Sequence, residues 1–403
     1  MPKVFEGIKV VDFTWAGVGP ITTKYLGDYG ATIIKVESKT KADIVRTSAP
    51  FKDKIPGVNR AGYFAQFNSN KYSMSINMNH PKGIELVKRL IAWADVLAES
   101  FAAGVMEKWG LGYEEVKKIK PDIIMYRTNM QGHTGVHSRL PGTGLSLVGL
   151  TGAAQVCGWP DRGPISPYGP YTDAIAPRFG AAVLIAALCY REETGKGQLL
   201  DMSQFEAGVN FLTPLVLDYC VNNRVASRAG NYCSYAAPHN AYRCRGQDRW
   251  CTIAVFSNEE WQSFCRVIGN PLWTRDERFA TLLGRKEHEL ELDRLVEGWT
   301  INHTGEEVMT LMQKGGVATG IVETNEDLLQ DPQLKHRHHF WILNHREMGP
   351  LSHMGQACQL SKTPAELKMA APCLGEHNEY VCTKILGMSD EEFVELLQQG
   401  VFD

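Results

Sequence analysis

A single carboxylate, Asp173, stands in the stiff segment SPYGPYTDAIAPRFG (166–180), just before the apolar run AAVLIAALCY. An aspartate here could cap the following helix, because its oxygen accepts an orphan backbone N–H. It could also serve as a nucleophile or base held on a rigid loop. Pro177 favours a helix that starts near residue 177, with proline at its preferred first position. Asp173 would then precede the helix and point into a cleft, with the helix N-terminus favouring its charged form.

Two further features of the sequence could bind an anionic ligand. The segment TWAGVGP, with Gly17 and Gly19, predicts either a tight strand-to-helix turn or a turn that offers N–H groups to a ligand. Lys71 falls in the predicted polar loop NSNKYS, and Lys108 belongs to the glycine-containing segment AAGVMEKWG. Most loop lysines are only solvated, but two on one edge of a sheet would suit a ligand with several phosphates.

The sequence motifs of several common enzyme classes are absent. No G-x-G-x-x-G follows the first predicted strand, and neither a phosphate-binding loop nor a G-x-S-x-G elbow is present. The ten cysteines form no C-x-x-C pair and are expected to be reduced thiols. His336, His338 and His339 lack a Cys or Glu companion at ligand spacing, so no metal site is expected.

The composition is that of an ordinary soluble chain with more than one domain. Of 403 residues, 44% are hydrophobic and 22% are charged, and the formal net charge is -3. Such a chain has no overall field for nucleic acid or an anionic membrane, so neither is expected as a partner. The longest apolar stretch, 181–190, is too short to cross a bilayer, and the N-terminus lacks a signal-peptide pattern. A cytoplasmic location is therefore expected.

Residues 9–128 alternate between short β-rich runs and helical segments. Strands are predicted at 9–13, 32–37, 96–100 and 123–128, and a helix opened by proline is predicted at 81–93. This alternation predicts right-handed crossovers and an α/β fold with a doubly wound parallel sheet. Ligands of such sheets bind beyond the carboxyl ends of the strands. We therefore expect TWAGVGP, ESKTK and SFAAGVM to line the site.

The character of the sequence changes between residues 225 and 330, where short strands mix with charged amphipathic helices. This change predicts a second, smaller α+β domain. The predicted division is 1–205 for the first part of a Rossmann-like large domain, 206–334 for linker helices and the small domain, and 335–403 for a return to the large domain.

Eight segments, taken in order, resemble the class III CoA-transferases, the family of formyl-CoA and carnitine CoA-transferases. They are GIKVVDFTWAGVGP, YGATIIKVES, FNSNKYSMSINM, ADVLAESFAAGVMEKWGLGYEEV, PDIIMYR, TGKGQLLDMS, DPQLKHR and PCLGEHNEYV. The resemblance covers essentially the whole chain. Each segment alone is a modest match, but eight in the correct order are highly specific.

The resemblance implies a large doubly wound domain built from both chain ends, a small domain, and two chains interlocked as a dimer. It places the nucleophilic aspartate of the family at Asp173. The CoA contacts that it implies are Trp15, Ala16 and Gly17 in the first turn, with Lys71, Ser100, Phe101 and Lys108. It implies no metal and no permanently bound cofactor, since CoA and acyl-CoA are substrates. The partner subunit would be a second copy or a paralogue in a hetero-oligomer.

The activity implied by the resemblance is transfer of CoA from an acyl-CoA donor to a carboxylic acid, through an aspartyl anhydride and an aspartyl-CoA thioester. Succinyl-CoA with a benzylsuccinate-like acid is one substrate pair within the family, used by benzylsuccinate CoA-transferase. Related α-methylacyl-CoA racemases carry a His-Asp pair where this chain has Thr143 and Gly144. A racemase of this sequence would lack one of its two bases. An inactive partner subunit of a hetero-oligomeric transferase is the third interpretation.

Overall fold

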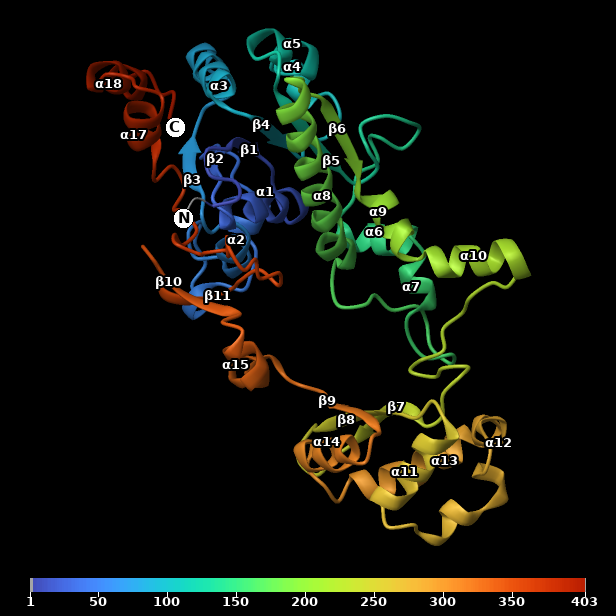
Figure 1. The fold of residues 1–403 in the computed structure, drawn as a ribbon. Helices are drawn as coiled ribbons and strands as arrows, with labels where there is room; N and C mark the ends of the chain where they lie inside the picture. The colour runs from blue at the N-terminus through green and yellow to red at the C-terminus, as the bar shows by residue number, and fades with distance from the viewer. Residues whose placement is uncertain (1–2, 403) are drawn as a thin grey trace. The chain divides into compact units, whose positions relative to one another are not determined.

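The computed structural model describes residues 3–402, which form two compact units (Figure 1). The large unit comprises the chain up to Ala154, Ser166–Val225, and the chain from Gln333 onward. The small unit comprises Gln155–Ile165 and Ala226–Pro332. Residues 206–225, which the predicted division grouped with the small domain, therefore lie in the large unit.

A six-stranded parallel sheet forms the centre of the large unit, in the order β3-β2-β1-β4-β5-β6. The strands are β1 (Lys9–Phe13), β2 (Thr32–Glu37), β3 (Tyr72–Ser75), β4 (Val96–Glu99), β5 (Ile124–Asn129) and β6 (Leu199–Ser203). The predicted doubly wound parallel sheet is thus confirmed. The sequence prediction lacked β3 and β6, because YSMS and LLDMS contain none of the β-branched residues typical of strands.

Helices connect the strands and cover both faces of the sheet. Those of the large unit are α1 (Val18–Asp28), α2 (Gly62–Phe67), α3 (Pro81–Trp93), α4 (Val105–Lys108), α5 (Tyr113–Ile119), α6 (Gly144–Leu150), α8 (Tyr171–Thr194), α9 (Gln204–Phe211), α10 (Thr213–Asn222), α17 (Asn378–Tyr380) and α18 (Asp390–Gln398). Two short helices contain boundaries between the units along the chain, α7 (Ala153–Val156) and α16 (Pro332–His336). The helix predicted at 81–93 is confirmed as α3.

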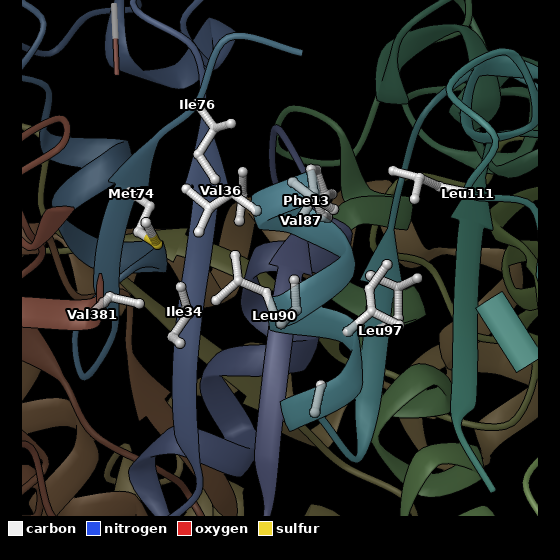
Figure 2. Packing of buried hydrophobic residues seen from close by; sticks show 14 of the residues in the cluster. Phe13, Ile34, Val36, Met74, Ile76, Val87, Leu90, Leu97, Leu111 and Val381 are labelled. Carbon is white, nitrogen blue, oxygen red and sulfur yellow. The ribbon is translucent and has the colours of Figure 1, made fainter. Parts of the chain in front are cut away.

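Successive strand residues alternate between two buried cores, as expected for a sheet covered on both faces. On one face, Phe13, Val36 and Leu97 form a buried cluster with Val87 and Leu90 of α3 (Figure 2). Burying a side chain of this size contributes about 1.5–3 kcal/mol, so this face supplies much of the stability of the unit.

The opposite face buries Val10 and Tyr126 together with Leu184 of α8. This helix has 24 residues and could span a membrane by length and composition alone, although its most apolar window is 44% buried within the protein. It packs against α1, α6 and α9. One side of α8 is therefore part of the core of the large unit.

The C-terminal part of the chain returns to the large unit beside β3. The N–H of His377 donates to the carbonyl of Ser73 (3.0 Å), and the N–H of Asn77 donates to the carbonyl of Val401 (2.8 Å). An antiparallel hairpin of β10 (Phe340–His345) and β11 (Gly349–Met354) precedes this segment. These contacts confirm the expectation that the large domain is built from both chain ends.

The small unit contains an antiparallel sheet in the order β7-β8-β9 and a separate core. Its elements are β7 (His239–Arg243), β8 (Trp250–Ala254), α11 (Asn258–Val267), α12 (Leu282–Glu287), α13 (Glu289–Thr300), α14 (Gly305–Lys314), β9 (Ala318–Ile321) and α15 (Asn325–Gln330). The core contains Tyr242, Phe264, Phe279 and Leu292. A smaller α+β part of the chain is thus confirmed.

The strand order places the candidate site at the boundary between β1 and β4. The chain adds β2 and β3 on one side of β1 and then crosses over to add β4, β5 and β6 on the other. The connections that follow β1 and β4 leave in opposite directions, and a crevice forms between them at the carboxyl edge of such a sheet. The turns after Phe13 and Glu99 therefore lie side by side.

Candidate functional site

The turn after β1 is held by side chains from other parts of the large unit. The N–H of Trp15 donates to Oγ of Ser100 (2.7 Å), just after β4, and the N–H of Ala16 donates to Oδ1 of Asp43 (2.9 Å). Ala16 has a φ of 60°, in the left-handed region that a residue with a side chain rarely adopts. These bonds hold a strained turn in one conformation. The turn ends at Gly17, the residue before α1.

Asp12 belongs to β1, just before this turn, and both oxygens of its carboxylate have hydrogen-bond partners. Its carboxylate accepts hydrogen bonds from N–H and Oγ1 of Thr14 (2.8 and 2.5 Å), from Oγ1 of Thr23 (2.7 Å) and from Nζ of Lys71 (2.9 Å). Burial would raise the pKa of Asp12, but the charges of Lys71 and Lys35 lower it. Asp12 is therefore an ionised anchor of the turn.

Lys71 is completely buried in the same cluster. Besides Asp12, its ammonium contacts the carbonyl of Pro20 (2.9 Å), Oγ1 of Thr23 (2.9 Å) and Oδ1 of Asn68 (3.0 Å). An ammonium has only three protons to donate, so this set of acceptors satisfies it. The structure thus places Lys71 neither in a solvated loop nor within reach of a ligand, because a phosphate contact would require the cluster to open. A buried amine needs a counter-charge, and Asp12 provides it.

Ser100 and Phe101 follow β4 and lie beside the first turn, as the strand order predicts. The rings of Trp15 and Phe101 meet edge to face, with centroids 5.5 Å apart. The indole Nε1 of Trp15 is buried and has no hydrogen-bond partner among residues 3–402, so it could donate to a bound ligand. Lys108 ends the short helix α4 that follows, and its side chain is exposed.

A second charged cluster supports this turn after β4. The N–H of Phe101 donates to Oε2 of Glu99 (2.7 Å), and Oε1 of Glu99 pairs with Arg127 (3.2 Å) and His133 (3.1 Å). His133 also pairs with Asp201 (3.0 Å). Burial would lower the pKa of His133, but Glu99 and Asp201 raise it. The turn after β1 and the turn after β4 are therefore both held in place by buried carboxylates.

Asp173 lies inside helix α8, which begins at Tyr171. The prediction that the helix starts near Pro177 is wrong, because Pro177 is in its interior. The missing N–H of this proline leaves the carbonyl of Asp173 without its usual helical partner. Packing of α8 against three other helices outweighs this local cost, as tertiary contacts often do.

The carboxylate of Asp173 lies between two glycines from different elements. A Cβ atom placed on Gly17 would be 3.4 Å from Oδ2, and a Cβ atom placed on Gly144 would be 2.5 Å from Oδ1. Burial raises the pKa of Asp173 to about 6, and only Thr172 acts in the opposite direction. The expectation that the helix N-terminus keeps this pKa low is therefore wrong, since desolvation dominates.

The structure brings five of the predicted site residues together with Asp173: Trp15, Ala16, Gly17, Ser100 and Phe101. Sequence reasoning missed the supporting residues Asp12, Asp43 and Gly144. An acid within the apolar run KVVDF was a usable signal for Asp12, because a buried carboxylate needs partners. Gly144 was noted only as a position where the racemases carry a base, and nothing in the sequence indicated its packing against Asp173.

The groups available for chemistry are one carboxylate and the N–H groups that open α1. Those of Gly17, Val18 and Gly19 have no acceptor within their own helix. Among residues 3–402, no group of three or more His, Cys, Asp or Glu side chains is arranged to hold a metal ion. Fold and site together define a doubly wound α/β enzyme with a candidate carboxylate at the switch point of its sheet.

The family follows from comparison with known proteins. The chain belongs to CoA-transferase family III, whose model matches residues 5–378. It is therefore a CoA-transferase, and CoA thioesters are the substrates of this family.

Individual relatives span nearly the whole chain. The succinyl-CoA–D-citramalate CoA-transferase of Chloroflexus aurantiacus is 30% identical over 99% of this chain and 98% of its own length. The beta subunit of the succinyl-CoA–L-malate CoA-transferase of the same organism is 29% identical over 98% of this chain and 97% of its own length. The crystal structure of a CaiB/BaiF family protein from Brucella suis has a TM-score of 0.88 and 28% identity, covering 96% of this chain and 100% of that one.

Proposed function

We propose that this CoA-transferase moves CoA from succinyl-CoA to a carboxylic acid acceptor, with Asp173 as the nucleophile. The observation that carries the proposal is the state of this carboxylate, which lies beside the start of α1 with a pKa raised to about 6. At pH 7 about nine-tenths of such a group is ionised, and it is more basic than an ordinary aspartate. The donor is taken from the names of the relatives, which use succinyl-CoA.

The reaction begins when an oxygen of Asp173 attacks the thioester carbonyl and expels CoA thiolate, which leaves a mixed anhydride. The thiolate then attacks the aspartyl carbonyl, releases succinate and forms an aspartyl-CoA thioester. The acceptor carboxylate attacks this thioester, giving a second anhydride and thiolate. Attack of the thiolate on the acceptor acyl carbon yields the new CoA ester and restores Asp173. Every intermediate is an activated acyl group, so positioning and exclusion of water supply most of the catalysis.

Specific groups of the two turns fit the CoA end of the substrate. The unpaired Nε1 of Trp15 and the exposed ammonium of Lys108 are free to donate to an anionic or amide-rich ligand. Gly17 lies beside the carboxylate of Asp173, so the N–H groups that open α1 at Gly17 and Val18 suit the oxyanion of each tetrahedral intermediate. Ser100 acts indirectly, by holding the N–H of Trp15. Lys71 has a supporting role in this proposal, through Asp12.

Racemase activity is the less favoured alternative. A second base opposite Asp173 would be needed at positions 143 or 144. The Thr143 side chain instead caps α6, in a capping box with Ser146. Gly144 has no side chain, and its backbone already lies against Asp173. Proton exchange at an α-carbon therefore lacks its second base, which favours transfer.

We also propose that the functional unit contains two interlocked chains. Helix α10 has no buried residue, and apolar side chains along it are more than 45% exposed, namely Val216, Leu217, Tyr219 and Val221. An apolar surface of this kind favours coverage by another chain. A paralogue is an alternative partner, because one relative is named as a beta subunit. Val216→Glu with Leu217→Glu should shift the mass in light scattering to that of a monomer; an unchanged mass would contradict this use of α10.

The function is tested by incubating the purified protein with succinyl-CoA and a panel of acids, among them D-citramalate, L-malate and benzylsuccinate. We expect a new acyl-CoA with at least one acceptor. Hydroxylamine added with succinyl-CoA alone should leave a hydroxamate on Asp173, seen by peptide mass spectrometry, and none in Asp173→Ala. Racemisation of a 2-methylacyl-CoA without any acid acceptor, or full transfer by Asp173→Ala, would overturn the proposal.

A further inference from the structure

We infer that Gly144 is a positioning residue for Asp173: because it has no side chain, the backbone of α6 packs directly on the carboxylate and sets where its two oxygens lie. The inference rests on the proposed role of Asp173 as the nucleophile. No motif in the sequence indicates how the carboxylate of Asp173 is held in position.

The approach of Gly144 is closer than a side chain permits. A Cβ atom at this position would lie 2.5 Å from Oδ1 and 3.0 Å from Cγ of Asp173, and would also overlap Cβ of Pro170. Carbon atoms that are not bonded to one another reach their best packing at about 3.5–4.0 Å. Any other residue at position 144 must therefore displace the carboxylate, the proline, or α6 itself.

Conformation does not explain why position 144 carries glycine. Gly144 opens α6, and its backbone is not in the left-handed region that favours glycine. The same helix contains Gly149, where an added Cβ atom would meet nothing within 4 Å. Glycine costs a helix about 1 kcal/mol relative to alanine, so neither position gains helix stability from it. Gly144 makes the close contact with Pro170 and Asp173, and Gly149 has no counterpart of it.

Contact with backbone suits a nucleophile better than hydrogen bonding does. Donors to the carboxylate would hold it in place but would lower its pKa and its nucleophilicity, as they do for Asp12. Asp173 has no cationic partner among residues 3–402, and only Thr172 acts to lower its pKa. Its two oxygens lie beside Gly17 of the first turn and Gly144 of α6. Oδ1 packs on α6, and Oδ2 faces the start of α1. The packing thus directs one oxygen toward the turn proposed to hold the thioester.

The test compares two substitutions within one helix, Gly144→Ala and Gly149→Ala. A displacement of about 1 Å in a reacting group costs on the order of 100-fold in rate, so kcat of Gly144→Ala should fall by about that factor. KM for succinyl-CoA should stay within about threefold, because the proposed CoA contacts belong to other elements. Gly149→Ala should keep kcat within about twofold. Hydroxamate formation on Asp173 should slow in parallel with kcat.

A second variant separates the carboxylate from the proline. Gly144→Ala combined with Pro170→Gly removes the overlap with Pro170 and retains the overlap with Asp173. It should raise the melting temperature above that of Gly144→Ala and leave kcat low. Recovery of kcat in this double variant, an unaffected kcat in Gly144→Ala, or equal losses in Gly144→Ala and Gly149→Ala would each overturn the inference. Failure of the wild-type protein to form the hydroxamate would instead overturn the proposed function.

Discussion

Asp12 and Asp173 are two carboxylates of the large unit with opposite surroundings. Asp12 accepts hydrogen bonds from Thr14, Thr23 and Lys71, and nearby lysine charges lower its pKa. Asp173 has no cationic partner among residues 3–402, and burial raises its pKa to about 6. Hydrogen-bond donors and lysine charges make the carboxylate of Asp12 stabilising and unreactive. Without a cationic partner, the carboxylate of Asp173 is costly to bury and available for chemistry.

The comparison predicts that losing the charge has opposite effects at the two positions. Asp173→Asn should reduce transfer by on the order of 10³-fold or more, because the nucleophile is lost. The same change should raise the free energy of unfolding at pH 7 by up to about 3 kcal/mol, since it removes a charge that is costly to bury. Asp12→Asn should lower it by about 3–5 kcal/mol, because Lys71 loses its counter-charge. Transfer assays and urea unfolding measure both effects.

The pH dependence of this stability effect gives a control with a defined sign. The pKa of Asp173 is raised above its usual value of 3.8, so its ionisation opposes folding only above that value. The gain in Asp173→Asn should therefore be complete above about pH 6 and vanish below about pH 4. Unimpaired transfer by Asp173→Asn, with deamidation excluded by mass spectrometry, would contradict the proposed role of this residue.

Lys71 and Lys108 extend the comparison to the cations. Lys71→Met should lower the free energy of unfolding by about 3–5 kcal/mol, because it leaves Asp12 buried without a counter-charge. Lys108→Met, at an exposed position, should change stability by less than about 0.5 kcal/mol and raise KM for acyl-CoA severalfold. Chemical unfolding and steady-state kinetics check both. A Lys71→Met variant of normal stability with a raised KM would make Lys71 a ligand contact after all.

The fall in kcat/KM on the acid side of the pH–rate profile should follow the protonation of Asp173. Protonation removes the nucleophile, so kcat/KM should fall about tenfold per pH unit below a midpoint near pH 6. Asp12 does not titrate in this window, because its pKa is lowered, and the fold should remain intact there. Circular dichroism at each pH is the control. A kcat/KM that stays constant down to pH 5 would argue against an aspartate with this pKa as the attacking group.

The smallest effect is expected at the hydrogen bond between the two turns. Ser100→Ala leaves the N–H of Trp15 without its acceptor, at a cost of about 1–3 kcal/mol. KM for acyl-CoA should rise more than kcat falls, since Trp15 belongs to the proposed CoA site. Thr310→Ala, at an exposed position of α14 in the small unit, serves as the control and should change neither. Equal behaviour of the two variants would mean that Ser100 does not support the site.

Local sequence signals predicted some elements of the large unit correctly and others not. The helix at 81–93 was predictable because a proline opens it and an apolar stripe follows, and the structure has α3 at Pro81–Trp93. Pro177 gave a misleading signal for α8, because contacts with α1, α6 and α9 hold a helix that a proline would otherwise interrupt. The strand β6 was missed because nothing in LLDMS marks it as a strand.

The sequence by itself determined the alternation of strands and helices, the glycine turn after the first strand, and the presence of an acid before the long apolar helix. Only the tertiary structure decided which charges are paired. Lys71 meets Asp12 from 59 positions away, and Gly144 reaches Asp173 from a separate helix. The physical reason is that the reactivity of a carboxylate depends on its burial and its partners, and both are set by which distant segments the fold brings together.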